Sequence, residues 1–249
     1  MADFNHAILA ETMHRPWPMP SGPWIMTQTW NDLLFAHWRV DRSVIRARVP
    51  EAFEIDTFEG EAWVGVVPFS MTNVGPRFVP ALPGISAFPE LNVRTYVRVG
   101  DKPGVYFFSL DAGSALAVQT ARGLLNLPYY TADMHVELRD PDVHYESRRL
   151  SEPAAAFHAI YRGLGDVRPG AAGTLEYFLT ERYCLYAIDR HGSPYRLEIH
   201  HPPWPLESAR VEIRVNTMAS AAQLGLPSSP PLLHFAKRQD MVAWAPQRI

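Results

Sequence analysis

The sequence contains few of the residues on which several common chemistries depend. Cys184 is the only cysteine among the 249 residues, which excludes an internal disulfide and a cysteine-rich zinc site. Only two residues, Lys102 and Lys237, are lysines, and all the other basic residues are arginines. Because arginine keeps its proton and cannot act as an amine nucleophile, Schiff-base chemistry has only two candidate centres.

Long apolar runs and a strong excess of one charge are also missing. No apolar segment approaches the roughly 18 residues of a membrane-spanning helix. The first twenty residues lack the basic start and apolar run of a signal peptide. The chain has 23 basic and 26 acidic residues, so charge gives no reason to expect nucleic acid or an anionic membrane as a partner. We expect a cytoplasmic protein.

The common catalytic motifs are absent from the sequence. It has no GxSxG elbow, no P-loop and no GxGxxG before a helix. The ten histidines form no HExxH pattern, and the adjacent pair His200-His201 would face opposite sides of a strand. We therefore expect no metal and no cofactor.

What the sequence does contain is a series of short strand patterns. Residues 1–23 are rich in proline and predict an extended arm on the surface of a single domain over residues 24–249. The clearest strand is LNVRTYVRV, residues 91–99, where Asn92 and Arg94 alternate with apolar neighbours. Closely spaced strands with turns between them predict a mainly β fold, a barrel or sandwich.

Two helices interrupt the strand patterns. The segment DRSVIRARVP predicts a short helix that Asp41 caps and Pro50 ends. The alanine-rich segment AGSALAVQTARGLLN predicts a central helix, with Asp111 or Ser114 as its cap, which Pro128 separates from the next strand.

Five segments, in matching order, carry a resemblance to a known family: VIRARVPEAFEIDTFEGEAWVGVVPF, FPELNVRTYV, FFSLDAGSALAV, LPYYTADM and TERYCLYA. Together they resemble the YqjF-like family of uncharacterised proteins over residues 30–244. That family is in turn similar to the acetoacetate decarboxylases, whose fold is a closed β-barrel with a buried pocket. The resemblance implies this barrel here, with one central helix and a short N-terminal helix.

The resemblance also shows where this chain departs from the decarboxylases. In those enzymes a proline after the helix precedes two lysines, one of which forms a Schiff base with a β-keto acid. Here Tyr129 and Tyr130 follow Pro128, and a phenol cannot form an imine. The decarboxylase arginine of the first strand corresponds to Asn31. The resemblance therefore implies a barrel without the Schiff-base lysine.

The candidate site residues follow from this alignment and from the strand pattern. Glu90 matches the region of an active-site glutamate, and with Tyr129 it is the candidate catalytic pair. Tyr129 and Tyr130 would point to opposite faces of their strand, so only one of the two would enter the pocket with Glu90, where burial would raise the pKa of the carboxyl group. The candidate ligand-binding residues are Arg94, Tyr130, His37, Asp111, Glu181 and Arg182. Asp111 is equally explained as a helix cap, and Glu181 or Arg182 as a member of a buried pair that positions a strand.

Three functions are compatible with these residues. The first is binding of a small carbonyl or carboxylate metabolite. In the second, the protein is an enzyme, a lyase or hydrolase that acts on a small oxo or carboxylic acid through Glu90 and a tyrosine without a Schiff base. The third is a structural protein with a filled barrel, and assembly into a homo-oligomer is compatible with all three. A cavity with inward polar groups would favour the first two.

Overall fold

The computed structural model describes residues 6–79 and 86–249. The beginning of the predicted arm lies outside these residues. In the described part the strands are β1 (Met26–Val40), β2 (Glu54–Ile55), β3 (Ala62–Pro76), β4 (Phe88–Val99), β5 (Lys102–Ala112), β6 (Tyr129–Arg139), β7 (Asp142–Arg149), β8 (Ala156–Gly163), β9 (Cys184–Ile188), β10 (Pro194–His200), β11 (Glu207–Asn216), β12 (Leu232–Ala243) and β13 (Gln247–Arg248). The helices are the 3₁₀ helix η1 (His6–Ala10), α1 (Arg42–Arg46), α2 (Ala115–Leu125), α3 (Leu175–Thr180) and α4 (Met218–Ala221).

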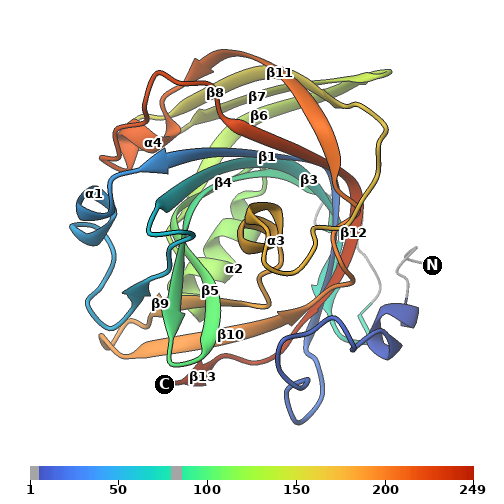
Figure 1. The fold of residues 1–249 in the computed structure, drawn as a ribbon, viewed down its shortest axis with the longest axis vertical. Helices are drawn as coiled ribbons and strands as arrows, with labels where there is room; N and C mark the ends of the chain where they lie inside the picture. Colours follow the sequence, from blue (N-terminus) through green and yellow to red (C-terminus); the bar gives the residue numbers. More distant parts are fainter. Residues whose placement is uncertain (1–5, 80–85) are drawn as a thin grey trace.

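The strand pairings close into a ring, in the order β10, β9, β5, β4, β3, β1 and β12, with β12 pairing back to β10. Four further strands, β6, β7, β8 and β11, form a ladder that connects β5 to β12 on one side of the ring. In Figure 1 the ladder lies above β1, β3 and β4, and α2 and α3 are seen within the outline of the ring. The prediction of a mainly β fold is confirmed.

Strands β1, β3 and β4 separate the inside of the ring from the ladder, so both of their faces are covered. This explains why the sequences of β1 and β3 contain nearly continuous apolar runs. Side chains of one parity pack toward the ladder, where Leu34, Val66 and Leu91 share a core with Tyr145 and Tyr161. Side chains of the other parity belong to a core inside the ring, with the members Leu33, Phe35, Val67 and Phe69. The polar residues at inward positions of β4 are therefore buried inside the ring.

Local capping sets the helix ends. The Asp41 side chain accepts a hydrogen bond from the Ser43 backbone N–H at 2.7 Å, as the sequence predicts for α1. For α2 the cap is Ser114, which accepts from Ala117 at 3.4 Å, and Asn126 ends the helix in the left-handed conformation with φ 49°. Asp111 does not cap this helix.

Several elements go beyond the sequence prediction. The hairpin of β4 and β5 turns tightly at Gly100, whose φ of 61° favours glycine, so β5 begins at Lys102. The strand β7 and the short helices α3 and α4 were not predicted from the sequence. Within the described residues, none of the helices has both the length and the apolar character needed to cross a membrane.

Candidate functional site

A cavity of about 120 Å³ lies inside the ring, surrounded mostly by apolar side chains. Its polar lining includes Glu90, Asn92 and Arg94 from β4, and Tyr129 from β6. Between α3 and β9, Arg182 adds a second guanidinium group to the lining. Because β4 alternates, its three polar residues at positions two apart share one face. The alternation of residues 91–99 in the sequence therefore explains why Asn92 and Arg94 lie together on the polar side of this cavity.

Glu90 is a buried carboxyl group without a counter-ion. The residue is 4% exposed, and the described residues form no ion pair with it. Among residues 6–79 and 86–249, the only side-chain hydrogen bond to it comes from the Tyr129 hydroxyl, which donates to Oε2 at 2.9 Å. Burial disfavours the charged carboxylate and raises the pKa of Glu90 to about 8, although the Tyr129 hydrogen bond lowers it. A carboxyl group with a pKa of about 8 can both donate and accept a proton near neutral pH, as general acid–base chemistry requires.

The two tyrosines after Pro128 have different surroundings. Tyr129 lines the cavity, and burial together with the nearby Glu90 carboxyl raises the pKa of its phenol well above the ordinary value. At neutral pH it is therefore a hydrogen-bond donor. Tyr130 is not part of the cavity lining, and its ring stacks on the Arg149 guanidinium at 3.8 Å. The structure brings Tyr129, but not Tyr130, to Glu90.

Arg94 presents a cation at the other end of the polar face. One terminal nitrogen donates to the Leu179 backbone carbonyl at 3.1 Å, and the guanidinium lies over the Phe35 ring at 5.2 Å. Its buried Nε has no hydrogen-bond partner among the described residues. No ion pair joins Arg94 to Glu90, so the cation and the carboxyl group do not neutralise each other.

Arg182, but not Glu181, forms the buried ion pair that the sequence suggested for one of these two residues. Its guanidinium bonds Asp56 at 2.6 Å, with side-chain exposures of 5% and 14%, and Arg182 also lines the cavity. Glu181 accepts hydrogen bonds from the Tyr183 hydroxyl and from the Trp204 backbone N–H, and it is not part of the cavity lining. The distant partners Asp56 and Trp204 could not be read from the local sequence.

His37 and Asp111 also lie outside the cavity lining. His37 is fully buried, and its Nε2 contacts the Tyr96 hydroxyl at 2.6 Å. Burial and the charge of Arg94 hold the pKa of His37 well below its ordinary value, so the ring is neutral. Asp111 accepts two hydrogen bonds from Arg149, at 2.8 and 2.6 Å. These contacts give both residues structural partners.

Sequence reasoning missed several polar members of the cavity lining, among them Asn92 and Trp204. Asn92 was recognised only as an alternating residue, and Trp204 gave no signal because it lies in the proline-rich stretch HPPWP. Asn92 Oδ1 and Trp204 Nε1 are buried and have no hydrogen-bond partner among the described residues. In the same part of the chain, no group of three or more His, Cys, Asp or Glu residues could hold a metal ion.

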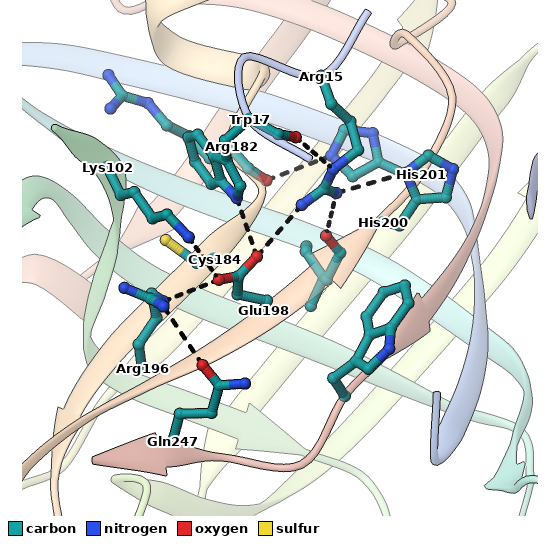
Figure 2. A network of polar contacts seen from close by, with 12 residues as sticks. Arg15, Trp17, Lys102, Arg182, Cys184, Arg196, Glu198, His200, His201 and Gln247 are labelled. Carbon is teal, nitrogen blue, oxygen red and sulfur yellow. Dashed lines mark hydrogen bonds and ion pairs between the residues drawn. The ribbon is translucent and has the colours of Figure 1, made fainter. Parts of the chain in front are cut away.

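The residues after η1 are anchored to the ring by one buried carboxylate (Figure 2). Glu198 on β10 accepts a hydrogen bond from the Trp17 indole at 2.9 Å and pairs with Arg15 at 3.4 Å. It also pairs with Lys102 and Arg196, each at 3.0 Å. Lys102 is therefore held in an ion pair, and it does not line the cavity.

The other lysine is also remote from Glu90. Lys237 pairs with Asp32, and its side chain is 69% exposed. Among the residues that line the cavity, none is a lysine.

The fold and the buried polar face define the class to which this chain is similar. Acetoacetate decarboxylase from Legionella pneumophila aligns over 100% of this chain and 97% of its own, with a TM-score of 0.61 and 14% identity. The enduracididine biosynthesis enzyme MppR, in complex with pyruvate, aligns over 94% of this chain and 93% of its own, with a TM-score of 0.60 and 10% identity. At this identity the similarity establishes an acetoacetate decarboxylase-like fold.

The sequence comparison identifies the family. The chain belongs to the DUF2071 family, described as an uncharacterized conserved protein, whose profile matches residues 27–240. It is also 50% identical over 226 residues to the uncharacterized protein YqjF of Bacillus subtilis strain 168, covering 91% of this chain and 93% of that protein. The resemblance to the YqjF-like family is confirmed.

Proposed function

We propose that this protein binds a small oxo acid or carboxylic acid in the cavity beside Glu90. The observation that carries this proposal is the set of unpartnered polar atoms on residues of the cavity lining, namely Arg94 Nε, Asn92 Oδ1 and Trp204 Nε1. A buried polar group without a partner costs on the order of 1–3 kcal/mol. A ligand carboxylate would accept hydrogen bonds from Arg94 Nε and Trp204 Nε1, whereas Asn92 Oδ1 would accept one from a donor group of the ligand such as a hydroxyl.

The size and charge of the cavity define the ligand class. Its volume of about 120 Å³ is near that of a cavity that holds benzene, about 150 Å³, so the ligand has few heavy atoms. Arg94 offers two-pronged hydrogen bonding to a carboxylate. The neutral form of Glu90 can donate to a carbonyl oxygen. The complex of MppR with pyruvate, an oxo acid of this size, supports the same class.

A second candidate function, acid–base catalysis on the bound acid, is favoured by the environment of Glu90. A pKa of about 8 leaves both protonation states accessible near neutral pH. Tyr129 holds the carboxyl group from one side, so Glu90 would transfer the proton and Tyr129 would orient it. The chemistry would be that of a lyase or hydrolase that forms no imine.

Binding is tested by thermal unfolding in the presence of pyruvate, acetoacetate, lactate and benzoate as probes. We expect at least one probe to raise the Tm of the wild-type protein by about 5 °C at saturating concentration, because binding to the folded state alone stabilises it. We expect Arg94→Gln to abolish this rise, since the carboxylate loses its cation.

Arg98→Gln is the matched control for this experiment. Arg98 lies on the same strand, its Nε bonds the Gly100 carbonyl at 3.2 Å, and it does not line the cavity. This variant should respond to the probe as the wild-type protein does. An equal response of wild type and Arg94→Gln would place the ligand elsewhere.

The proposed chemistry also predicts the result of reductive trapping. Incubation with acetoacetate and sodium borohydride should leave the mass of the protein unchanged, because Lys102 and Lys237 are held in ion pairs outside the cavity. Intact-mass spectrometry followed by peptide mapping measures this. A reduced adduct on either lysine would show that imine chemistry survives in this chain.

A further inference from the structure

A second concavity lies on the surface next to the cavity. This groove has a volume of about 770 Å³ and runs between the end of α1, the end of α2, and α4. Strands β5, β6 and β9 form its floor, where four tyrosines gather: Tyr106, Tyr129, Tyr130 and Tyr186. The groove is larger and more open than the cavity, so it can admit a molecule that the cavity holds.

The groove carries positive charge without compensation. Arg48, which follows α1, and Arg122, in the last turn of α2, are both exposed and line it. Within the described chain neither guanidinium forms an ion pair, and no Asp or Glu belongs to the groove lining. Two cations above a low-dielectric floor of aromatic side chains produce a positive potential that attracts anions.

The groove and the cavity share a wall. Phe107, Leu127 and Tyr129 line both. Tyr129 donates its hydroxyl hydrogen bond to Glu90 on the cavity side, so the residue that contacts the candidate acid–base group also borders the groove. These three side chains therefore border both spaces.

We infer that the groove is the access route to the cavity and that Arg48 and Arg122 select small organic anions at its mouth. This inference rests on the proposed function for the identity of the ligand. It adds the route, the gate formed by Phe107, Leu127 and Tyr129, and the two residues that steer the ligand. Neither arginine contacts the bound ligand in this scheme, so each acts on the rate of association.

A cysteine placed inside the cavity provides a reporter for the route. The native thiol does not serve, because Cys184 is opposite Glu198 in the β9–β10 pairing and its Sγ lies beside Gly104 on the outer face of β9. Val105 lines the cavity, so Val105→Cys combined with Cys184→Ser leaves one thiol, at the cavity. Every protein compared below carries both substitutions, and wild type there means that Arg48, Arg122 and Gly123 are unchanged. Methanethiosulfonate reagents react when the thiolate attacks the sulfenyl sulfur, forming a mixed disulfide and releasing methanesulfinate, and intact mass follows the reaction. The ratio of rates for two reagents is independent of the thiolate fraction, which is the same for both.

The experiment compares an anionic reagent, 2-sulfonatoethyl methanethiosulfonate, with the cationic 2-trimethylammonioethyl reagent at low salt. After correction for their rates with free cysteine, we expect the anionic reagent to label the cavity thiol of the wild-type reporter protein faster. In the double variant Arg48→Gln/Arg122→Gln this preference should fall by about tenfold, the lower range of electrostatic steering. Added salt should reduce the preference of the wild-type protein in the same direction.

Arg210→Gln is the matched control, because Arg210 is an exposed arginine outside the groove. It should leave the preference unchanged. An unchanged preference in the double variant would overturn the steering role of the two arginines. Failure of both reagents to label the folded wild-type protein would overturn the route itself.

A steric variant tests the route without changing charge. A Cβ at Gly123 in the groove meets no atom within 4 Å, so Gly123→Trp fills the groove without strain. We expect it to slow both reagents severalfold. Gly225→Trp, at a position that is also open but outside the groove, should not slow them. Equal rates in both tryptophan variants would contradict the route.

These results are separable from the test of the proposed function. If the cavity binds none of the acids, the labelling rates still report whether the groove admits anions. If the acids bind but substitutions at Arg48, Arg122 and Gly123 do not change the labelling rates, the ligand enters by another route and the proposed function stands.

Discussion

Replacing Glu90 with glutamine should stabilise the protein at alkaline pH and leave its stability almost unchanged at acidic pH. The folded state raises the pKa of Glu90 from 4.5 to about 8. Between these two values the folded protein holds a proton that the unfolded chain releases. The free energy of unfolding therefore falls as the pH rises from about 4.5 to about 8, and it is level above that range.

The size of this effect follows from the same two values. Each pKa unit corresponds to about 1.4 kcal/mol, so ionising Glu90 in the folded state costs on the order of 4 kcal/mol by pH 8.5. Urea unfolding of wild type and Glu90→Gln at pH 5, 7 and 8.5 measures it. The difference between the two proteins should grow steadily with pH in favour of the variant.

Two further variants make the assignment specific. Glu51→Gln changes an exposed glutamate and should leave the pH dependence unchanged. Tyr129→Phe removes the hydrogen bond that lowers the pKa of Glu90, so the loss of stability should extend to higher pH. A pH profile of Glu90→Gln that parallels the wild-type profile would mean that Glu90 is charged in the folded protein.

Removing Arg149 should produce the largest loss of stability among single substitutions near the site. Arg149 and Asp111 form a two-pronged ion pair with side-chain exposures of 2% and 0%. In Arg149→Met the Asp111 carboxylate remains buried without its partner, which costs about 3–5 kcal/mol. Urea unfolding at pH 7 measures this loss.

The neighbouring arginine provides the control for this prediction. Arg148 pairs with Asp133 on the surface, with side-chain exposures of 71% and 67%, so Arg148→Met should cost less than about 1 kcal/mol. The double variant Asp111→Asn/Arg149→Met should recover much of the stability, because the unpaired charge is gone. If the two arginine variants lose equal stability, the buried pair is not the reason.

The strands of the ring were predictable from the sequence where polar and apolar residues alternate strongly. The pattern of residues 91–99 placed Asn92 and Arg94 on one face, and the structure shows this face inside the ring. The sequence could not supply the partners, because they come from distant segments. Arg149 reaches Asp111 across 38 residues, and no local pattern distinguishes it from the exposed Arg148 beside it.

His37 illustrates a different limit of prediction from the sequence. It lies on the inward face of β1 with Phe35, on whose ring it stacks, so the sequence places it on the correct face of the strand. Its Nε2, however, contacts the hydroxyl of Tyr96, which is 59 residues away in the sequence. Strand periodicity predicts the face on which a residue lies, but not which distant side chain it meets there.

The ion pairs of Glu198 with Arg15, Lys102 and Arg196 have a consequence for the order in which the chain can fold during synthesis. Arg15 leaves the ribosome early, but its carboxylate partner is made 183 residues later. Strand β1 must likewise wait for β12, with which it pairs along most of its length. Although β3 can pair with one edge of β1 early, the other edge of β1 and the partner position of Arg15 stay open until translation is nearly complete. A ribosome stalled before β10 would therefore hold an open, apolar-edged intermediate.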